Sequence, residues 1–273
     1  MCFLSLGPRE DRDVIEGWRS TMLKSLAIVI AAIFVVGTIS HSVYAQAERS
    51  KAYGLLVDNT RSLEKQFDQV KLLSLRVVDR VHKQGSVQLF SFKWTRDASN
   101  FVMSNDVQSY EGENHDRAIG TLGIDWTQDE DLLTRYIEGL GIVKGQTDLF
   151  GAIRLVGESL NAKTADPQAA PLDKVIILIT DGEHRMEMIG TSQPTETNDE
   201  RSSRDSRLRK YLKESGIKVY AIGLTGELDT GENRRLQAEN YLSKLTKETG
   251  GRVVFSRSKQ PDIDKLVNQL LGP

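Results

Sequence analysis

The segment from Ala52 to Val57 does most to limit what this chain can fold into. Its six residues are largely apolar and lack the spacing of an amphipathic helix, which favours a strand buried on both faces. The run ends at Asp58, and a helical pattern of apolar side chains begins at once: Leu63, Phe67, Val70, Leu72, Leu73 and Val77. A buried strand leading straight into a helix is typical of a βαβ unit, so we expect a parallel sheet covered by helices.

A second segment, Lys174–Thr180, is the clearest strand pattern in the chain. It is a β-branched run without polar alternation, as expected of a central parallel strand. Further strands are expected at 86–94, 218–223 and 252–255, with 100–103 as a short hairpin partner, while 104–126 predicts no element. Helices are expected at 62–84, 205–215, 233–249 and 262–271. Two more are expected to begin at a capping-box pattern, Thr127–Glu130, and directly after the loop 145–149. This alternation predicts an α/β fold: a Rossmann-like, doubly wound, mainly parallel sheet with helices on both faces.

Residues 23–39 hold the longest apolar run, nearly uncharged from Ser25 onward, and precede the predicted domain. Lys24 before the uncharged part and small residues around Ala45 and Ala47 after it match the anatomy of a secretory signal peptide. Its apolar core is short of the roughly 20 residues that span a bilayer, which favours cleavage over a membrane anchor at 26–39. We therefore expect an extension from a misassigned start at 1–21, a signal peptide or anchor at 22–45, and one extracytoplasmic domain at 46–273, either periplasmic or secreted.

Charge and cysteine content exclude several classes of function. The net charge of −2 gives no basic surface for nucleic acid, and membrane contact is expected only if the apolar segment stays uncleaved. The single cysteine, Cys2, excludes a disulfide framework and a Cys/His zinc site.

Oxygen-bearing side chains follow the first strand at every second position: Asp58, Thr60 and Ser62. Ligands of open α/β sheets bind at the carboxyl ends of the strands, and hard oxygens there suit Mg²⁺ or Mn²⁺. The alternative is that Thr60 and Ser62 only cap the following helix.

Two more loops carry oxygen ligands in corresponding positions. Thr147 lies in a glycine-led loop before a helix, and Asp181 follows the central strand in a Thr-Asp-Gly sequence. Each has a structural alternative, a helix cap for Thr147 and a turn for Asp181 with Gly182. The next residues, 183–203, are expected to form a mobile polar surface loop on the same rim, with His184 solvated in it.

Together these three loops resemble the metal-ion-dependent adhesion site of von Willebrand factor type A domains, across roughly Lys51 to Leu271. The family pattern is D-x-S-x-S, then a separate threonine, then D-G after a central apolar strand. The resemblance implies that the metal ligands are Asp58, Thr60, Ser62, Thr147 and Asp181, with Thr60 in place of a serine. Arg61 stands where the family often has glycine, and we expect this cation to be a candidate for partner binding.

The resemblance implies a non-enzymatic module that uses Mg²⁺ or Mn²⁺ to grip an exposed Asp or Glu of a partner protein. Two aspartates neutralise a divalent ion without repelling an incoming carboxylate, which favours this interpretation over a closed metal cage. The alternative is a metal-assisted hydrolase of phosphoesters, although the sequence offers no nucleophile beside a base and no Walker lysine loop.

Overall fold

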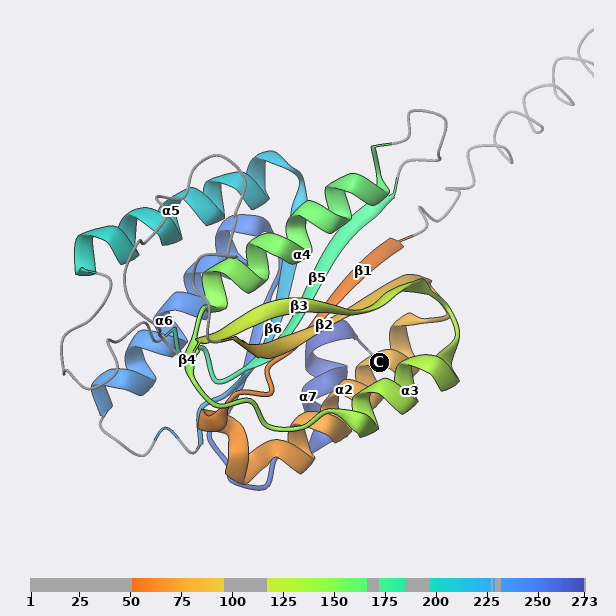
Figure 1. Cartoon of the computed structure of the whole chain (residues 1–273), viewed down its shortest axis with the longest axis horizontal. Helices are drawn as coiled ribbons and strands as arrows, with labels where there is room; N and C mark the ends of the chain where they lie inside the picture. The colour runs from red at the N-terminus through yellow and green to blue at the C-terminus, as the bar shows by residue number, and fades with distance from the viewer. Residues whose placement is uncertain are drawn as a thin grey trace, which may run out of the picture. The chain divides into compact units, whose positions relative to one another are not determined.

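A seven-stranded sheet forms the centre of the described structure, a computed structural model (Figure 1). The strands are β1 (Lys51–Val57), β2 (Gly85–Thr95), β3 (Arg117–Thr127), β4 (Gln146–Thr147), β5 (Asp173–Thr180), β6 (Ile217–Leu224) and β7 (Val253–Ser256). Their order is β4-β3-β2-β1-β5-β6-β7, and only the β2–β3 pair is antiparallel. The predicted strands at 52–57 and 174–180 are therefore neighbours at the centre of a mainly parallel sheet.

The helices cover both faces of the sheet (Figure 1). They are the 3-10 helix η1 (Arg61–Gln66) and the α-helices α2 (Phe67–Val81), α3 (Glu130–Gly139), α4 (Leu149–Lys163), α5 (Asn198–Glu214), α6 (Glu232–Thr249) and α7 (Ile263–Leu271). Side chains of α2, α3 and α7 pack in one hydrophobic core, and those of α4, α5 and α6 in a second core. The predicted doubly wound α/β fold is confirmed.

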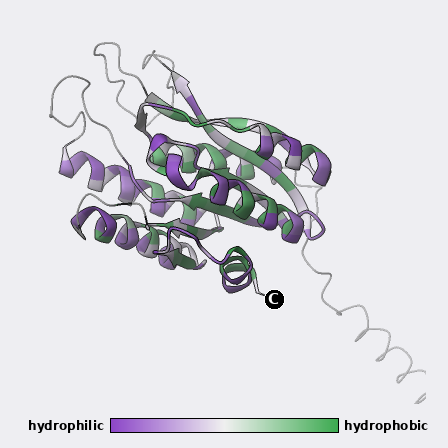
Figure 2. Ribbon diagram, turned by 90° about the horizontal axis from the view of Figure 1, so that it is seen from below, coloured by the Kyte–Doolittle hydropathy of each residue, from purple (hydrophilic) through white to green (hydrophobic). Residues whose placement is uncertain are grey.

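Strand β1 contributes to both cores, which explains its apolar sequence. Leu55 and Val57 lie in the core beneath α2, whereas Leu56 lies in the core beneath α4, and all three are fully buried. Successive side chains of a strand point to opposite faces, so a strand covered on both faces is apolar at every position. Figure 2 shows the hydrophobic residues gathered at the sheet and on the inner faces of the helices.

The expectation of no element at 104–126 was wrong for its second half, where β3 runs antiparallel to β2. Glycines made this strand resemble a loop. A Cβ on Gly120 would lie 2.6 Å from the Cα of Ala152 in α4, and a Cβ on Gly123 would lie 2.2 Å from the Tyr136 ring in α3. These glycines allow helices to approach the strand closely, a role that local sequence patterns do not reveal.

Two helix starts also differ from the predictions. Thr127 does not cap α3, because it is still part of β3; the cap is Asp129, whose carboxylate accepts a hydrogen bond from the Leu132 amide. In the segment 183–203, expected to be a loop, α5 begins at Asn198 behind a capping box of Thr197 and Glu200. The Thr-x-x-Glu pattern that signals this start was present in the sequence. The predicted helix 62–84 is instead a 3-10 helix followed by α2.

The structure describes residues 51–95, 117–165, 172–184, 197–226, 228 and 232–272. The predicted extension, the signal peptide or anchor and the hairpin partner at 100–103 lie outside these ranges. By contacts the chain divides into two units, Met1–Arg49 and Ser50–Pro273, and all described residues belong to the second. Within those residues, no helix is both long and apolar enough to cross a membrane.

Candidate metal-binding site

The loops after β1 and β5 lie side by side, because these strands are parallel neighbours in the sheet. The amide of Asp58 donates to the Ile179 carbonyl at 2.9 Å and so extends the ladder to the end of both strands. The Asp58 and Asp181 loops therefore meet at the carboxyl edge of the sheet, as predicted.

The carboxyl group of Asp58 is fully buried and accepts three hydrogen bonds. Its Oδ1 accepts from the amide of Thr60 at 3.0 Å and from the Thr60 hydroxyl at 2.7 Å. Its Oδ2 accepts from the hydroxyl of Thr180 at 2.6 Å. Burial raises the pKa of Asp58 and the charge of Glu183 raises it further, while the hydrogen bonds from Thr180 and Thr60 act in the opposite direction.

The hydroxyls of Thr60 and Ser62 lie together beside this carboxyl group, 3.2 Å apart. The Thr60 side chain makes no capping hydrogen bond to η1, although Thr60 stands at the N-cap position. Its hydroxyl proton goes to Asp58, which leaves the lone pairs of the oxygen available to a cation. The capping alternative for Thr60 is therefore not what the structure shows.

The two carboxylate oxygens of Asp181 differ, because one accepts a hydrogen bond from the described part of the chain and the other does not. Its Oδ1 accepts from the amide of Glu183 at 2.9 Å, in a turn that Gly182 allows with a φ of 81°. Among the described residues, the buried Oδ2 has no hydrogen-bond partner of normal geometry. Burial and the nearby Asp58 raise the pKa of Asp181 to about 8, although the Ser62 hydroxyl is near enough to lower it somewhat. The turn alternative therefore accounts for Oδ1 of Asp181 but not for Oδ2.

Thr147 lies in the segment that leads from α3 to α4, and it is buried, with only 5% of its surface exposed to solvent. This loop runs beside the Asp58 loop, because the amide of Val143 donates to the Asn59 carbonyl at 2.8 Å. Thr147 does not cap α4, since that role belongs to Asp148, whose Oδ1 accepts from the Gly151 amide. Backbone pairing of Thr147 with Ala118 holds the loop at the edge of β3.

Asp148 ties the Thr147 loop to the Asp181 loop and to α5. Its Oδ1 accepts from Arg204 at 2.9 Å and lies 3.9 Å from Nδ1 of His184. Burial raises the pKa of Asp148, but the charges of Arg204 and His184 and the hydrogen bond from the Gly151 amide lower it more. The pKa therefore lies below its usual range. His184 was expected to be solvated; it is buried and stacks on Phe150 with ring centroids 3.9 Å apart.

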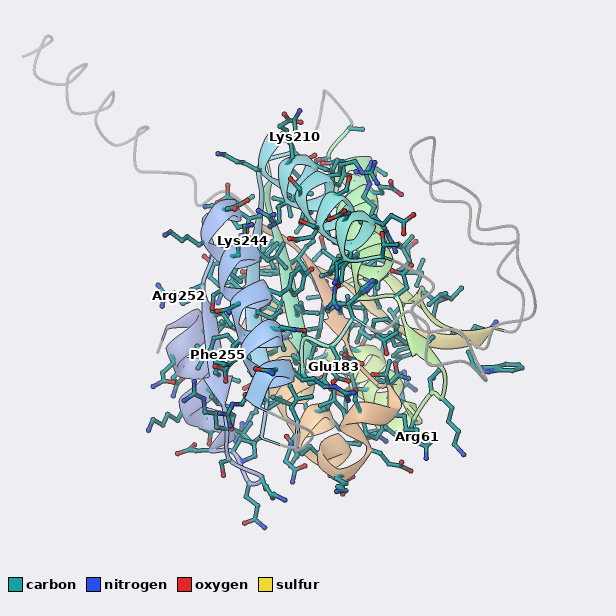
Figure 3. All side chains as sticks on the ribbon, turned by 90° about the vertical axis from the view of Figure 1, so that its left-hand side faces the viewer. Arg61, Glu183, Lys210, Lys244, Arg252 and Phe255 are labelled. Atoms are coloured by element: carbon teal, nitrogen blue, oxygen red, sulfur yellow. The ribbon has the colours of Figure 1, made fainter. Side chains whose placement is uncertain are left out.

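Arg61, the candidate for partner binding, is exposed at the start of η1 and pairs with no carboxylate among the described residues. Figure 3 shows Arg61 low in the view and Lys210 at the opposite end, with Glu183 nearer the middle. Arg61 stands in the chain between the candidate ligands Thr60 and Ser62.

The described residues contain no cluster of three or more His, Cys, Asp and Glu side chains that fits a metal ion. The predicted ligand set holds only two carboxylates, Asp58 and Asp181, and the rest are hydroxyls. Two neighbouring buried carboxyls with an unpartnered oxygen and two adjacent hydroxyls fit a hard divalent cation such as Mg²⁺. Thr180 and Asn59 were not among the predicted site residues, although Thr180 belongs to the Thr-Asp-Gly sequence that was recognised. The Thr180 side chain donates to Asp58, and the Asn59 side chain holds the neighbouring strand.

Solved structures share this fold. SpaC, a pilus adhesin of Lactobacillus rhamnosus GG, matches with a TM-score of 0.55 and 15% identity over 82% of this chain and 30% of SpaC. The vWF domain of the type V pili tip protein Mfa5 of Porphyromonas gingivalis matches with a TM-score of 0.51 and 12% identity over 81% of this chain and 95% of that domain. The chain has the von Willebrand factor type A fold.

At these identities the likeness to the type A domains extends to the fold and no further. A structure of three N-terminal domains of Mfa5 agrees, with a TM-score of 0.54 and 12% identity over 82% of this chain and 49% of that structure. No protein-family model and no curated protein matches the sequence. In this type A fold Asp58, Thr60 and Ser62 follow β1 and Asp181 follows β5, at the carboxyl edge of the central sheet, whereas Thr147 lies before α4.

Proposed function

We propose that this chain is a protein-binding module of the adhesion or complex-assembly type that grips an acidic residue of a partner through a bound divalent cation. Asp58, Thr60, Ser62, Thr147 and Asp181 would hold Mg²⁺ or Mn²⁺ at the carboxyl edge of the sheet. When bound, the cation would supply an electrophilic centre for the partner's carboxylate.

The observation that carries this proposal is the unpartnered Oδ2 of Asp181, buried beside the carboxyl group of Asp58. Two buried carboxyls next to each other destabilise a fold unless something compensates their charge. Because the Thr60 hydroxyl donates its proton to Asp58, its oxygen keeps a lone pair toward this position, which supports a cation as the partner of Asp181. A divalent ion matches both the charge and the oxygen ligands.

The balance of charge favours capture of an acidic partner over permanent caging of the ion. Two aspartates would only neutralise a divalent cation, so a third carboxylate can join without meeting excess negative charge. Arg61, exposed at the beginning of η1, adds a positive charge on the rim and would steer such a partner toward the site.

A location outside the cytoplasm agrees with the signal-like segment at 22–45. Similar structures belong to a pilus adhesin and to a pili tip protein. For this chain, surface or periplasmic residence is part of the proposal.

Calorimetric titration of the full chain with Mg²⁺ and with Mn²⁺ tests the metal site. We expect saturable binding by the wild type, and loss of binding for Asp58→Ala and for the milder Ser62→Ala. Asp68→Asn, which removes an exposed carboxyl group on α2, is the control and should bind as the wild type does. Metal binding that survives in Asp58→Ala would remove Asp58 from the site, and no binding by the wild type would overturn the proposal.

Partner capture is tested with envelope extract passed over immobilised full chain in Mg²⁺ and then in chelator. Protein released specifically by the chelator, and not retained by Asp58→Ala, supports the adhesion role. Turnover of a generic phosphoester in Mg²⁺ or Mn²⁺ would instead support the hydrolase alternative.

A further inference from the structure

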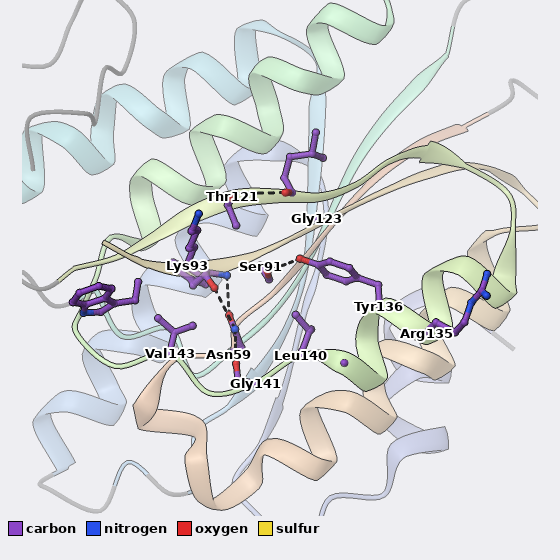
Figure 4. A pocket seen from close by; sticks show the side chains of 14 residues that line it. Asn59, Ser91, Lys93, Thr121, Gly123, Arg135, Tyr136, Leu140, Gly141 and Val143 are labelled. Atoms are coloured by element: carbon purple, nitrogen blue, oxygen red, sulfur yellow. Dashed lines mark hydrogen bonds between the residues drawn. The ribbon is translucent and has the colours of Figure 1, made fainter. Parts of the chain in front are cut away.

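A pocket of about 630 Å³ opens beside the candidate metal site, between the β2–β3 pair and the segment that links α3 to β4 (Figure 4). On the sheet side it is lined by residues of β2 and β3, including Ser91, Lys93 and Thr121. On the other side it is lined by the last turns of α3 and the following loop, including Tyr136 and Val143. None of these residues belongs to the proposed ligand set.

A hydrogen bond and close packing between the two walls define the shape of the pocket. Tyr136 spans it from α3, and its hydroxyl lies 3.0 Å from the Ser91 hydroxyl on β2 (Figure 4). Gly123 leaves room for the Tyr136 ring, since a Cβ there would meet ring atoms at 2.2 Å. At Gly139 and Gly141 a Cβ would meet nothing within 4 Å, so the pocket is open along the loop.

Asn59 connects this pocket to the metal-site loop. It lines the pocket and stands in the chain between Asp58 and Thr60. Its side chain accepts from the Phe92 amide at 2.7 Å and donates to the Gly141 carbonyl at 2.7 Å, so it holds both walls together. The pocket and the candidate metal site therefore share one rigid segment of backbone.

Strand β2 continues past the end of β1 at this point. Leu56 pairs with Phe90, and β2 runs on to Thr95, which pairs with Arg117 of β3. Lys93 thus lies beyond the level at which β1 ends, on the rim that a partner gripped by the metal would face. A chain segment bound at the metal site can continue along this wall.

The lining of the pocket is positively charged. Lys93 and Arg135 are both exposed, and neither forms an ion pair with a carboxylate of the described chain. No Asp or Glu is among the residues that line the pocket. Figure 4 shows the two cationic side chains at opposite sides, with Tyr136 between them. A single small anion would not meet both charges, whereas an extended segment with acidic side chains would.

We propose that this pocket is a second contact site for the same partner, and that it binds an extended protein segment bearing acidic side chains beyond the one at the metal. The inference rests on the proposed function, because it places acidic residues of one segment in adjacent sites. Lys93 and Arg135 would each meet an acidic side chain of the segment, and the hydroxyls of Thr121 and Tyr136 offer hydrogen bonds to its backbone. Such charge complementarity selects partners and speeds association.

The test is selection of displayed random 12-residue peptides on the immobilised full chain in Mg²⁺, followed by anisotropy titration of one enriched, fluorescently labelled peptide. We expect enriched peptides to contain at least two acidic residues. Lys93→Glu and Arg135→Glu should each weaken binding by about tenfold, because they place like charges together. Lys244→Glu, on an exposed lysine of α6 distant from Arg61 and Glu183 in Figure 3, makes the same charge change and should bind as the wild type does.

The outcomes separate this inference from the proposed function. Binding that is lost in chelator and in Asp58→Ala but unchanged in Lys93→Glu and Arg135→Glu would keep the metal site and overturn the second contact. Binding that is unchanged in chelator would overturn both the proposal that one segment occupies the two sites and the proposed function. Enrichment of peptides without acidic residues would also overturn the inference. Because both cations are exposed, thermal melting should show wild-type folding for each charge-reversal variant.

Discussion

Asp181→Asn should stabilise the metal-free protein while abolishing its response to Mg²⁺. The pKa of Asp181 rises from 3.8 to about 8 because the carboxyl is buried next to Asp58. At pH 7 the unfolded chain carries this group ionised, whereas the fold favours the protonated form. At about 1.4 kcal/mol per pH unit above the ordinary pKa, burial of Asp181 costs at most about 4 kcal/mol at pH 7.

The substitution removes this charge but retains a polar group. The new amide would lie where Oδ2 has no partner among the described residues, which costs about 1–3 kcal/mol. The net gain is therefore about 1–3 kcal/mol, or roughly 2–10 °C in Tm for a domain of this size. A residue that weakens the fold without metal and binds metal is expected at a functional site.

The sign of the pH dependence follows from the raised pKa. Below about pH 4 the carboxyl is protonated in both states, so the ionisation cost disappears while the cost of the amide remains, and the variant should be less stable than wild type by about 1–3 kcal/mol. The difference should shift in favour of Asp181→Asn as pH rises from about 4 to 8. Calorimetric melting in chelator at several pH values measures it, and Asp68→Asn should change Tm little at any of them.

Addition of Mg²⁺ should raise the Tm of the wild type, because a ligand that binds only the native state stabilises it, and should leave the variant unchanged. A variant less stable than wild type in chelator at pH 8, or an advantage that does not shrink toward pH 4, would refute the reasoning about the buried pair.

Four further predictions follow from contacts in the fold. Gly120→Ala should lower the free energy of unfolding by about 1–3 kcal/mol in denaturant, because the new Cβ would lie 2.6 Å from the backbone of Ala152. Gly216→Ala is the control: a Cβ there meets nothing within 4 Å, so only the smaller cost of its φ of 65° should appear. Arg204→Met should lower stability by about 3 kcal/mol at pH 7, because it leaves Asp148 buried without the Arg204 charge. This loss of stability should fade at low pH, where Asp148 becomes protonated. Arg207→Met, on the exposed side of α5, is the matched control. Thr147→Ala should weaken Mg²⁺ binding in calorimetric titration without lowering Tm in chelator, and equal affinity would remove Thr147 from the ligand set. Arg61→Ala should slow association of a selected peptide in surface plasmon resonance, more at low than at high salt, with little change in dissociation; an effect confined to dissociation would place Arg61 inside the contact.

Much of the fold was accessible from sequence because it depends on local patterns. The apolar runs at 52–57 and 174–180 predicted the two central strands, and the helical periodicity after the first run predicted the helix that follows it. Asp58 and Asp181 stand directly after those strands, so the parallel sheet alone predicts that their loops meet. The type A fold was predicted from the resemblance of the three oxygen-bearing loops, in their order, to the motif of that family.

What only the tertiary structure decided depends on contacts between segments distant in sequence. Strand β3 is recognisable once α4 and α3 are seen to pack on its glycines, and His184 is buried because Phe150 of α4 lies against it. The hydrogen bond from Thr180 to Asp58 joins residues 122 positions apart. Likewise, the unpartnered Oδ2 of Asp181 and the cationic pocket beside Asn59 arise where several loops converge. Periodicity reports which face of an element is buried, but only the packed loops determine which polar atoms are left without a partner.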